Sequence, residues 1–157
     1  KCDSNISAAK VFLTNKNSFS GNIPIELGLL QWLNMFQVSV YSLKCSIPIQ
    51  LCNIYSIDYF AMTHNQLIDE IPHYVGFTLP NIHALLLGSI RFTELILPSI
   101  SNATKLEKID FTNNSIRGNN LRTGKGNDLR FLDSLVNCSS SKVVSLGMNN
   151  HSPSITA

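Results

Sequence analysis

The sequence is poor in charged residues and contains no long apolar run. Only 14% of its 157 residues are charged, and the formal net charge is +2. Because Lys and Arg are spread along the chain, we expect no nucleic-acid partner. No apolar run approaches the roughly 20 residues that a membrane-spanning helix needs, so we expect no membrane contact within this segment. The chain begins with Lys1 and lacks an apolar signal-peptide core at its start, so we expect a piece of a longer protein.

Residue groups for metal or catalytic chemistry are also missing. The four histidines show neither the H-x-x-x-H nor the H-x-H spacing of metal ligands, and no G-x-S-x-G nucleophile sequence occurs. The stretch GNNLRTGKGND at 118–128 is similar to a phosphate loop only superficially. Its glycine spacing is too long, and Gly126 replaces the hydroxyl residue after Lys125. We therefore expect no metal, no cofactor and no enzymatic activity.

Two features bear on the cellular compartment. The cysteines lack the close spacing of a zinc site, and buried free thiols are as compatible with the sequence as one disulfide. They could pair in three ways, and they are Cys2, Cys45, Cys52 and Cys138. The sequence also holds five Asn-x-Ser/Thr sequons, which matter only in the secretory pathway. These expected glycosylation sites are Asn5, Asn102, Asn113, Asn137 and Asn150.

What the sequence does contain is a repeat. Ile-Pro occurs in GNIPIELGLL at 21–30, in CSIPIQLCNI at 45–54 and in DEIPHYVGFT at 69–78, so the prolines are 24 residues apart. A second feature keeps almost the same interval: two apolar residues separated by one residue, followed by a position that is often asparagine. This position falls at Asn17, Tyr41, Asn65, Ile90, Asn114 and Asn149, with spacings of 24, 24, 25, 24 and 35 residues.

The interval has a physical meaning. An apolar pair separated by one residue is the alternation of a short strand with one buried face. Because so short a unit cannot bury its apolar side alone, the copies must stack into a solenoid with parallel strands. The repeated asparagine then lies inside each bend, where its amide bonds to buried backbone groups. The Ile-Pro marks the outer side of each coil, with the isoleucine in the core.

This pattern resembles the plant extracellular leucine-rich repeat, L-x-x-L-x-x-L-x-L-x-x-N-x-L-x-G-x-I-P-x-x-L. NSFSGNIPIELGLL carries the resemblance most specifically, and the stretch at 119–140 is similar to an elongated repeat of immune-type plant receptor kinases. The resemblance implies an α/β leucine-rich-repeat solenoid (horseshoe) over residues 1–157, with short parallel strands on its concave face. We expect about six coils, some degenerate, and no complete caps. It further implies an ectodomain fragment of a receptor-like Ser/Thr protein kinase, without the kinase domain, at the extracellular face of the plasma membrane, or else a secreted protein.

Departures from the repeat predict local irregularities in the solenoid. Cys45, Asp69 and Glu94 replace the glycine found at Gly21, and FLTNKN before Asn17 carries one residue too many. At 118–128 the sequence predicts that a coil is lost. We expect a degenerate junction there: a flexible loop at 118–127, then a short helix on the convex side. We also expect strain or a gap between the strands near 109–111 and 144–146.

The repeat geometry predicts where a ligand binds. Residues between and just after the apolar pair point to the concave face, where a ligand meets several coils at once. Their mixture of aromatic, amide and charged groups suits a peptide or protein ligand, with a co-receptor ectodomain as a further partner. Two alternatives stay open, a secreted inhibitor of a cell-wall-degrading enzyme and a non-functional remnant of a receptor gene. The expected ligand-binding residues are Gln37, Ser39, Tyr59, Thr63, His64, His83, Lys108 and Asp110.

Overall fold

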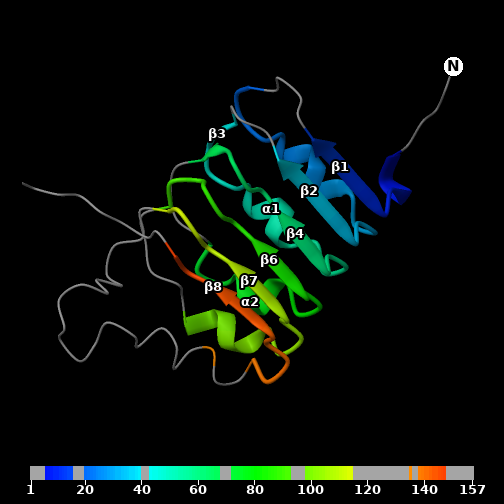
Figure 1. Ribbon diagram of the computed structural model, residues 1–157. Coiled ribbons are helices and arrows are strands. Elements are labelled where there is room, and N and C mark those ends of the chain that lie inside the picture. The colour runs from blue at the N-terminus through cyan, green and yellow to red at the C-terminus, as the bar shows by residue number, and fades with distance from the viewer. Residues whose placement is uncertain are drawn as a thin grey trace, which may run out of the picture.

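The fold is a stack of coils, each contributing one strand to a shared parallel sheet (Figure 1). The computed structural model describes residues 6–15, 20–39, 43–67, 72–92, 98–114, 135 and 138–147. Within these residues, the main sheet has six strands in chain order, all parallel to their neighbours. These strands are β1 (Val11–Asn15), β2 (Met35–Ser39), β4 (Tyr59–Ala61), β6 (Ala84–Leu86), β7 (Lys108–Asp110) and β8 (Val143–Ser145).

The strand register confirms the spacing predicted from the sequence. Equivalent positions in successive strands are Val11, Met35, Tyr59, Ala84, Lys108 and Val143. Their intervals are therefore 24, 24, 25, 24 and 35 residues, as in the asparagine phase. Thr14 pairs with Val38 in this register, so the expected extra residue before Asn17 is wrong.

The sheet is continuous at the point where a gap was expected. β7 pairs with β8 over three residues, with Ile109 opposite Val144. The expected gap is therefore wrong, because the 35-residue interval leaves enough chain to return into register. The predicted loop at 118–127 and most of the predicted helix lie outside the described residues. Leu135 and Cys138, at the end of that stretch, pack with the core.

Alternation along the strands separates the core from the concave face, by which we mean the side of the main sheet that faces away from the core. In β2, Phe36 and Val38 are buried, whereas the residues between and beside them are partly exposed. The aromatic rings of successive coils are in contact: Phe12 and Phe36 stack at a centroid distance of 5.6 Å, and Phe36 and Phe60 lie 5.3 Å apart with their planes tilted by 32°. One continuous apolar core therefore runs through the coils.

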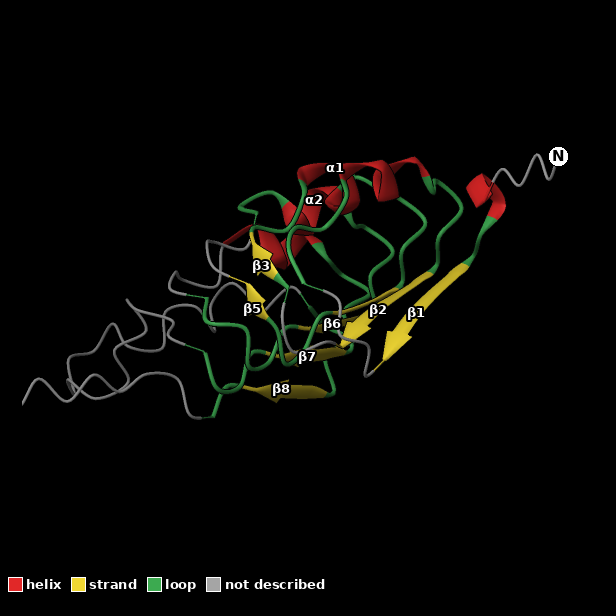
Figure 2. Cartoon of the chain, turned by 90° about the horizontal axis from the view of Figure 1, so that it is seen from above, coloured by secondary structure: helices red, strands yellow, loops and turns green. Residues whose placement is uncertain are grey.

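Short helices cover the other side of the core (Figure 2). η1 (Ile6–Ala8) precedes β1, and the outer layer consists of η2 (Ile25–Leu29), α1 (Ile49–Cys52), α2 (Val75–Thr78) and η3 (Pro98–Asn102). Pro24 and Pro48 are the N-caps of η2 and α1, and the isoleucine before each proline is buried, as predicted. Pro suits this position because a helix start has free amides that need no partner within the helix.

A second small sheet lies between the main sheet and the layer of helices (Figure 2). It pairs β3 (Lys44–Cys45) with β5 (Gln66–Leu67) in parallel, and Gly21 forms a parallel bridge to Leu43. Gly21 has φ +93°, in the region that glycine favours, as the repeat pattern requires. Cys45, at the matching position of the next coil, is the second residue of β3.

The asparagine ladder is confirmed at the two ladder asparagines that the structure describes. Asn65 and Asn114 have exposed fractions of 4% and 5%. Asn65 donates from Nδ2 to the carbonyl of Val38, one coil earlier, at 2.9 Å. Asn114 Oδ1 accepts from the amides of Ile90 and Phe92, at 3.2 and 3.1 Å. Ile90 occupies a ladder position but has no side-chain amide. The asparagine of the next coil, Asn114, accepts the hydrogen bond from its backbone amide.

Candidate functional site

The concave face presents two rows of side chains that run across the strands. The first row contains Met35, Tyr59, Ala84 and Lys108, which the register places opposite one another. The second row, two residues further along each strand, contains Gln37, Ala61, Leu86 and Asp110. Neighbouring strands lie about 4.8 Å apart, so an extended ligand lying across them contacts a new coil at each step.

Most of the predicted ligand-binding residues occupy these rows or their ends. Gln37, Tyr59 and Asp110 are half-buried, and Lys108 is exposed. Two further predicted residues meet directly, because the hydroxyl groups of Ser39 and Thr63 are 3.2 Å apart across adjacent coils. The positions of all six residues fit the predicted face.

The two predicted histidines lie at opposite ends of the strands. His83 is exposed and precedes β6, and its carbonyl accepts the amides of Glu107 and Lys108. His64 is exposed beyond the end of β4 and has φ 57°. The structure therefore does not bring the two imidazoles together, and His64 lines the polar hollow described below.

Asp110 is an acceptor with a fixed orientation. Its Oδ1 accepts from the amide and the hydroxyl group of Thr112, at 2.9 and 2.8 Å. Gly88, in the neighbouring coil, leaves the space that the carboxylate needs, because a Cβ there would lie 3.2 and 3.3 Å from its oxygens. A carboxylate held in this way loses little conformational freedom when it accepts a further hydrogen bond from a ligand.

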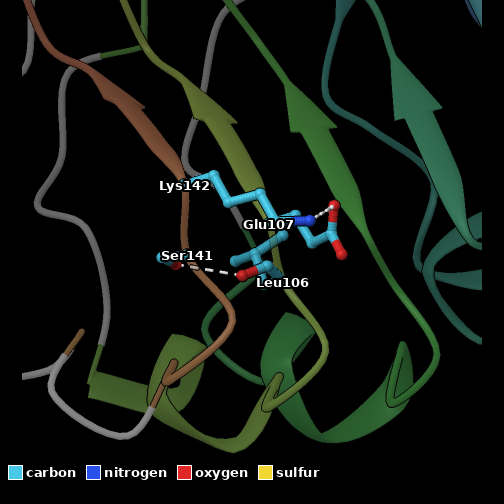
Figure 3. A network of polar contacts seen from close by, with 4 residues as sticks. All are labelled: Leu106, Glu107, Ser141 and Lys142. Carbon is cyan, nitrogen blue, oxygen red and sulfur yellow. Dashed lines mark hydrogen bonds and ion pairs between the residues drawn. The ribbon is translucent and has the colours of Figure 1, made fainter.

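An ion pair links the coils at the other end of the strands (Figure 3). Lys142 Nζ lies 2.9 Å from Glu107 Oε2, and Ser141 Oγ donates to the carbonyl of Leu106 at 3.0 Å. The hydrogen bond and the charge of Lys142 lower the pKa of Glu107, and the charge of His83 adds to this effect. Because both side chains of the pair are exposed, we expect the contact to hold the surface side chains beside β7 and β8 in place rather than to bind a ligand.

A polar hollow of about 390 Å³ opens beyond the carboxyl ends of the strands. Its lining residues come from three successive coils and are His64, Asn65, Gln66, Ser89, Arg91, Asn113 and Asn114. The sequence analysis did not predict Gln66 and Arg91 as site residues. The signal was nevertheless present, because these two residues are 25 positions apart, like the two strands that they follow.

The described thiols and sequons lie in different parts of the molecule. Cys52 and Cys138 are free and buried, and burial raises the pKa of Cys52 to about 12. Asn102 is exposed on η3, whereas Asn113 is exposed at the hollow and donates from Nδ2 to Ser89 Oγ at 3.1 Å. The other predicted glycosylation sites, Asn5, Asn137 and Asn150, lie outside the described residues.

Two searches of the described part of the chain concern metals and membranes. No group of three or more His, Cys, Asp or Glu side chains there is arranged to hold a metal ion. None of the described helices has the length and apolar character needed to cross a bilayer.

Comparison with solved structures places the fold among plant receptors. The crystal structure of a TDR receptor is 28% identical over 68% of this chain, with a TM-score of 0.65. The Arabidopsis receptor kinase HAESA, in complex with the peptide hormone IDA and the co-receptor SERK1, is 26% identical over 64% of this chain, with a TM-score of 0.58. The BIR2 ectodomain from Arabidopsis thaliana is 27% identical over 63% of this chain, with a TM-score of 0.60.

The chain matches only part of each of these proteins. It spans 18% of the TDR receptor chain, 17% of the HAESA chain and 52% of the BIR2 ectodomain. No protein-family model matches the sequence, and no curated protein matches it. The likeness therefore depends on three-dimensional structure together with the repeat pattern.

Proposed function

We propose that this chain, which is a leucine-rich-repeat segment of the plant receptor-ectodomain type, binds an extended peptide across its concave face. In this proposal the segment is a noncatalytic ligand-recognition module, and the peptide hormone in the HAESA complex supports this role. The observation that carries the proposal is the pair of side-chain rows that cross β2, β4, β6 and β7 in register.

The dimensions of the sheet fit a short peptide. Six strands are separated by five steps of about 4.8 Å, or about 24 Å in total, and an extended peptide of about seven residues spans this distance. Tyr59 offers an aromatic contact, Lys108 a positive charge and Asp110 an oriented acceptor. Such mixed surfaces recognise peptides through a few anchors rather than through one deep cavity.

The cellular setting is part of the same proposal. HAESA is seen with a peptide hormone and a co-receptor, which supports a peptide ligand and a co-receptor ectodomain as partners here. We place the chain at the extracellular face of the plasma membrane, as part of a single-pass receptor in plant defence signalling, or in a secreted form. The exposure of Asn102 on the helical side supports this placement, because a glycan there would leave the concave face open.

The test uses peptides selected for binding to the chain. A displayed library of ten-residue peptides is selected against the immobilised protein, and the enriched peptides are synthesised and titrated calorimetrically. We expect a triple variant of Tyr59→Ala, Lys108→Ala and Asp110→Ala to weaken binding at least about tenfold, because it removes the three main anchors.

A matched variant controls for loss of an aromatic ring, a lysine and an acid elsewhere. Tyr55→Ala, Lys105→Ala and Glu26→Ala change the same kinds of side chain at exposed positions outside the strands. We expect this variant to bind like the original chain. Equal weakening by the two variants, or failure of selection to enrich any peptide, would contradict the proposal.

A further inference from the structure

We propose that the lateral edge of the solenoid carries a second binding site, which takes a linear, neutral, β-linked glucan. By the lateral edge we mean the turns that lead into the strands, at 31–32, 55–56, 80–81 and 104–105. The two anchors of the site are Trp32 and Tyr55, which lie in these turns and outside the rows of the concave face. The site is therefore separate from the proposed peptide-binding surface, and the inference does not depend on that function.

Two large aromatic side chains are exposed at this edge. The exposed fractions of Trp32 and Tyr55 are 67% and 65%. Their turns belong to successive coils and lead into β2 and β4, which pair directly. Single exposed apolar side chains are ordinary on a protein surface, but two large rings in neighbouring turns form a patch of the kind that binds a partner.

Hydrogen bonds fix the backbone beneath both rings. The hydroxyl group of Ser56 donates to the carbonyls of Gln31 and Leu33, at 2.9 and 2.7 Å, and so holds the backbone on both sides of Trp32. Asn34 Nδ2 donates to the carbonyl of Ser56 at 3.0 Å. The two turns are therefore in direct contact, and a ligand that stacks on the rings does not have to order the chain beneath them.

Side-chain hydrogen bonds continue along the edge into the next two coils. Asn81 Nδ2 donates to the carbonyl of Tyr55 at 3.2 Å, and Lys105 Nζ donates to Asn81 Oδ1 at 2.7 Å. The aromatic pair is therefore followed by polar side chains along the direction in which the coils stack. A linear ligand that lies along the edge can contact the rings with one part and hydrogen-bonding groups with the next.

Sugar rings have the chemistry that matches this edge. The C–H groups of a pyranose ring give it an apolar, positively polarised face, and the face of an aromatic ring is negatively polarised. The sugar hydroxyl groups point outward from the rim, where amide and hydroxyl side chains can donate to them and accept from them. Neighbouring strands repeat about every 4.8 Å, which is close to the length of one sugar unit in an extended β-linked chain.

The charges near the rings favour a neutral ligand. Lys10 and Asp58 immediately precede β1 and β4, and their charges are opposite in sign. Lys105 lies two coils beyond Tyr55 and already donates to Asn81. An anionic membrane surface would require a cluster of Lys and Arg. A protein interface would be expected to surround such rings with apolar side chains, whereas polar groups continue the edge beyond Tyr55.

The test uses the fluorescence of Trp32, which reports this site directly because it is the one tryptophan of the sequence. The chain is titrated with cellohexaose, an extended β-linked glucan. Maltohexaose, which is α-linked and curved, and hexagalacturonate, which is charged, serve as comparators. We expect a saturable change in emission with cellohexaose and weaker binding of both comparators. An emission that does not respond to cellohexaose, or equal or tighter binding of either comparator, would overturn the inference.

Three variants locate the site. Tyr55→Ala and Trp32→Ala should each weaken the binding of cellohexaose at least about tenfold in calorimetric titrations, because each removes one stacking ring. Phe77→Ala removes an equally exposed ring from α2 and should leave the affinity unchanged. All three side chains are exposed, so urea unfolding should show that the variants keep their stability. Full affinity in Tyr55→Ala, or an equal loss in Phe77→Ala, would show that the rings at the edge are not the binding site.

The two proposed sites can be tested against each other. The triple variant of Tyr59, Lys108 and Asp110 should lose affinity for the selected peptides and keep its affinity for cellohexaose. The matched variant that contains Tyr55→Ala should show the reverse. Loss of cellohexaose binding in the first variant would contradict a separate site at the lateral edge. Binding of cellohexaose through Trp32 without binding of any peptide would support this inference while the peptide-binding proposal fails.

Discussion

Replacing Asn114 by alanine removes the most highly connected side chain of the asparagine ladder. Its Nδ2 donates to the carbonyls of Leu87 and Phe111, at 2.8 and 3.1 Å. Its Oδ1 accepts from the amides of Ile90 and Phe92, both of which belong to residues with an exposed fraction of 0%. Alanine leaves those two amides inside the core without an acceptor.

The magnitude follows from the number of orphaned donors. A buried amide without a partner costs roughly 1 to 3 kcal/mol, and two are orphaned, so Asn114→Ala should lower the free energy of unfolding by about 2 to 6 kcal/mol. Asn65→Ala should cost less, about 1 to 2 kcal/mol, because it removes donors from carbonyls, which tolerate loss of one partner better than amides do. Within the described residues, Asn65 Oδ1 has no hydrogen-bond partner to lose.

Urea unfolding followed by circular dichroism measures both changes. Asn53→Ala provides the matched control, because Asn53 is exposed and its removal should cost less than about 0.5 kcal/mol. An equal cost for the two ladder variants, or a larger cost for Asn65→Ala, would refute the assignment of amide acceptance to Asn114.

Three further predictions concern packing, ionisation and surface charge. Gly76→Ala should destabilise the chain by about 3 kcal/mol or more in the same urea assay, because its Cβ would overlap the backbone of η3. Gly147→Ala, which meets nothing within 4 Å, should be nearly neutral. Cys52 should resist thiol reagents in the folded chain. The free energy of unfolding should fall as pH rises from about 9 to about 12, because in this range the thiol ionises only in the unfolded chain. A Cys52→Ala variant that shows the same fall would contradict this. Lys142→Ala should raise the pKa of Glu107 toward its usual value in an NMR titration, and an unchanged pKa would show that the ion pair is not maintained in solution.

The regular part of the fold could be predicted from the sequence because the repeat fixes it. The strand register, the buried ladder asparagines and the isoleucines before proline all follow from one interval, since each coil must cover the next. The expected gap before β8 was wrong. It was predicted because one repeat motif is missing between the two strands, and a missing motif was taken to mean a missing coil. The backbone needs only enough length to return to register, and 35 residues provide it.

The candidate site was predictable only in part. The concave positions follow from strand alternation, so Tyr59, Lys108 and Asp110 could be predicted. Gly88 gives room to the Asp110 carboxylate because it lacks a side chain, and the sequence pattern does not relate these two positions in neighbouring coils. The hollow was not predicted because Arg91 follows a ladder position occupied by isoleucine rather than asparagine, and its positive φ leaves no mark in the repeat.

The most direct test of peptide recognition is a cross-saturation experiment on the complex with a selected peptide. The chain is deuterated, the peptide protons are irradiated, and the loss of amide signal maps the contact surface. We predict losses along β2, β4, β6 and β7, centred on Gln37, Tyr59 and Asp110. Losses confined to the helical side, around the exposed side chains of Ile25, Ile49 and Phe77, would contradict the account.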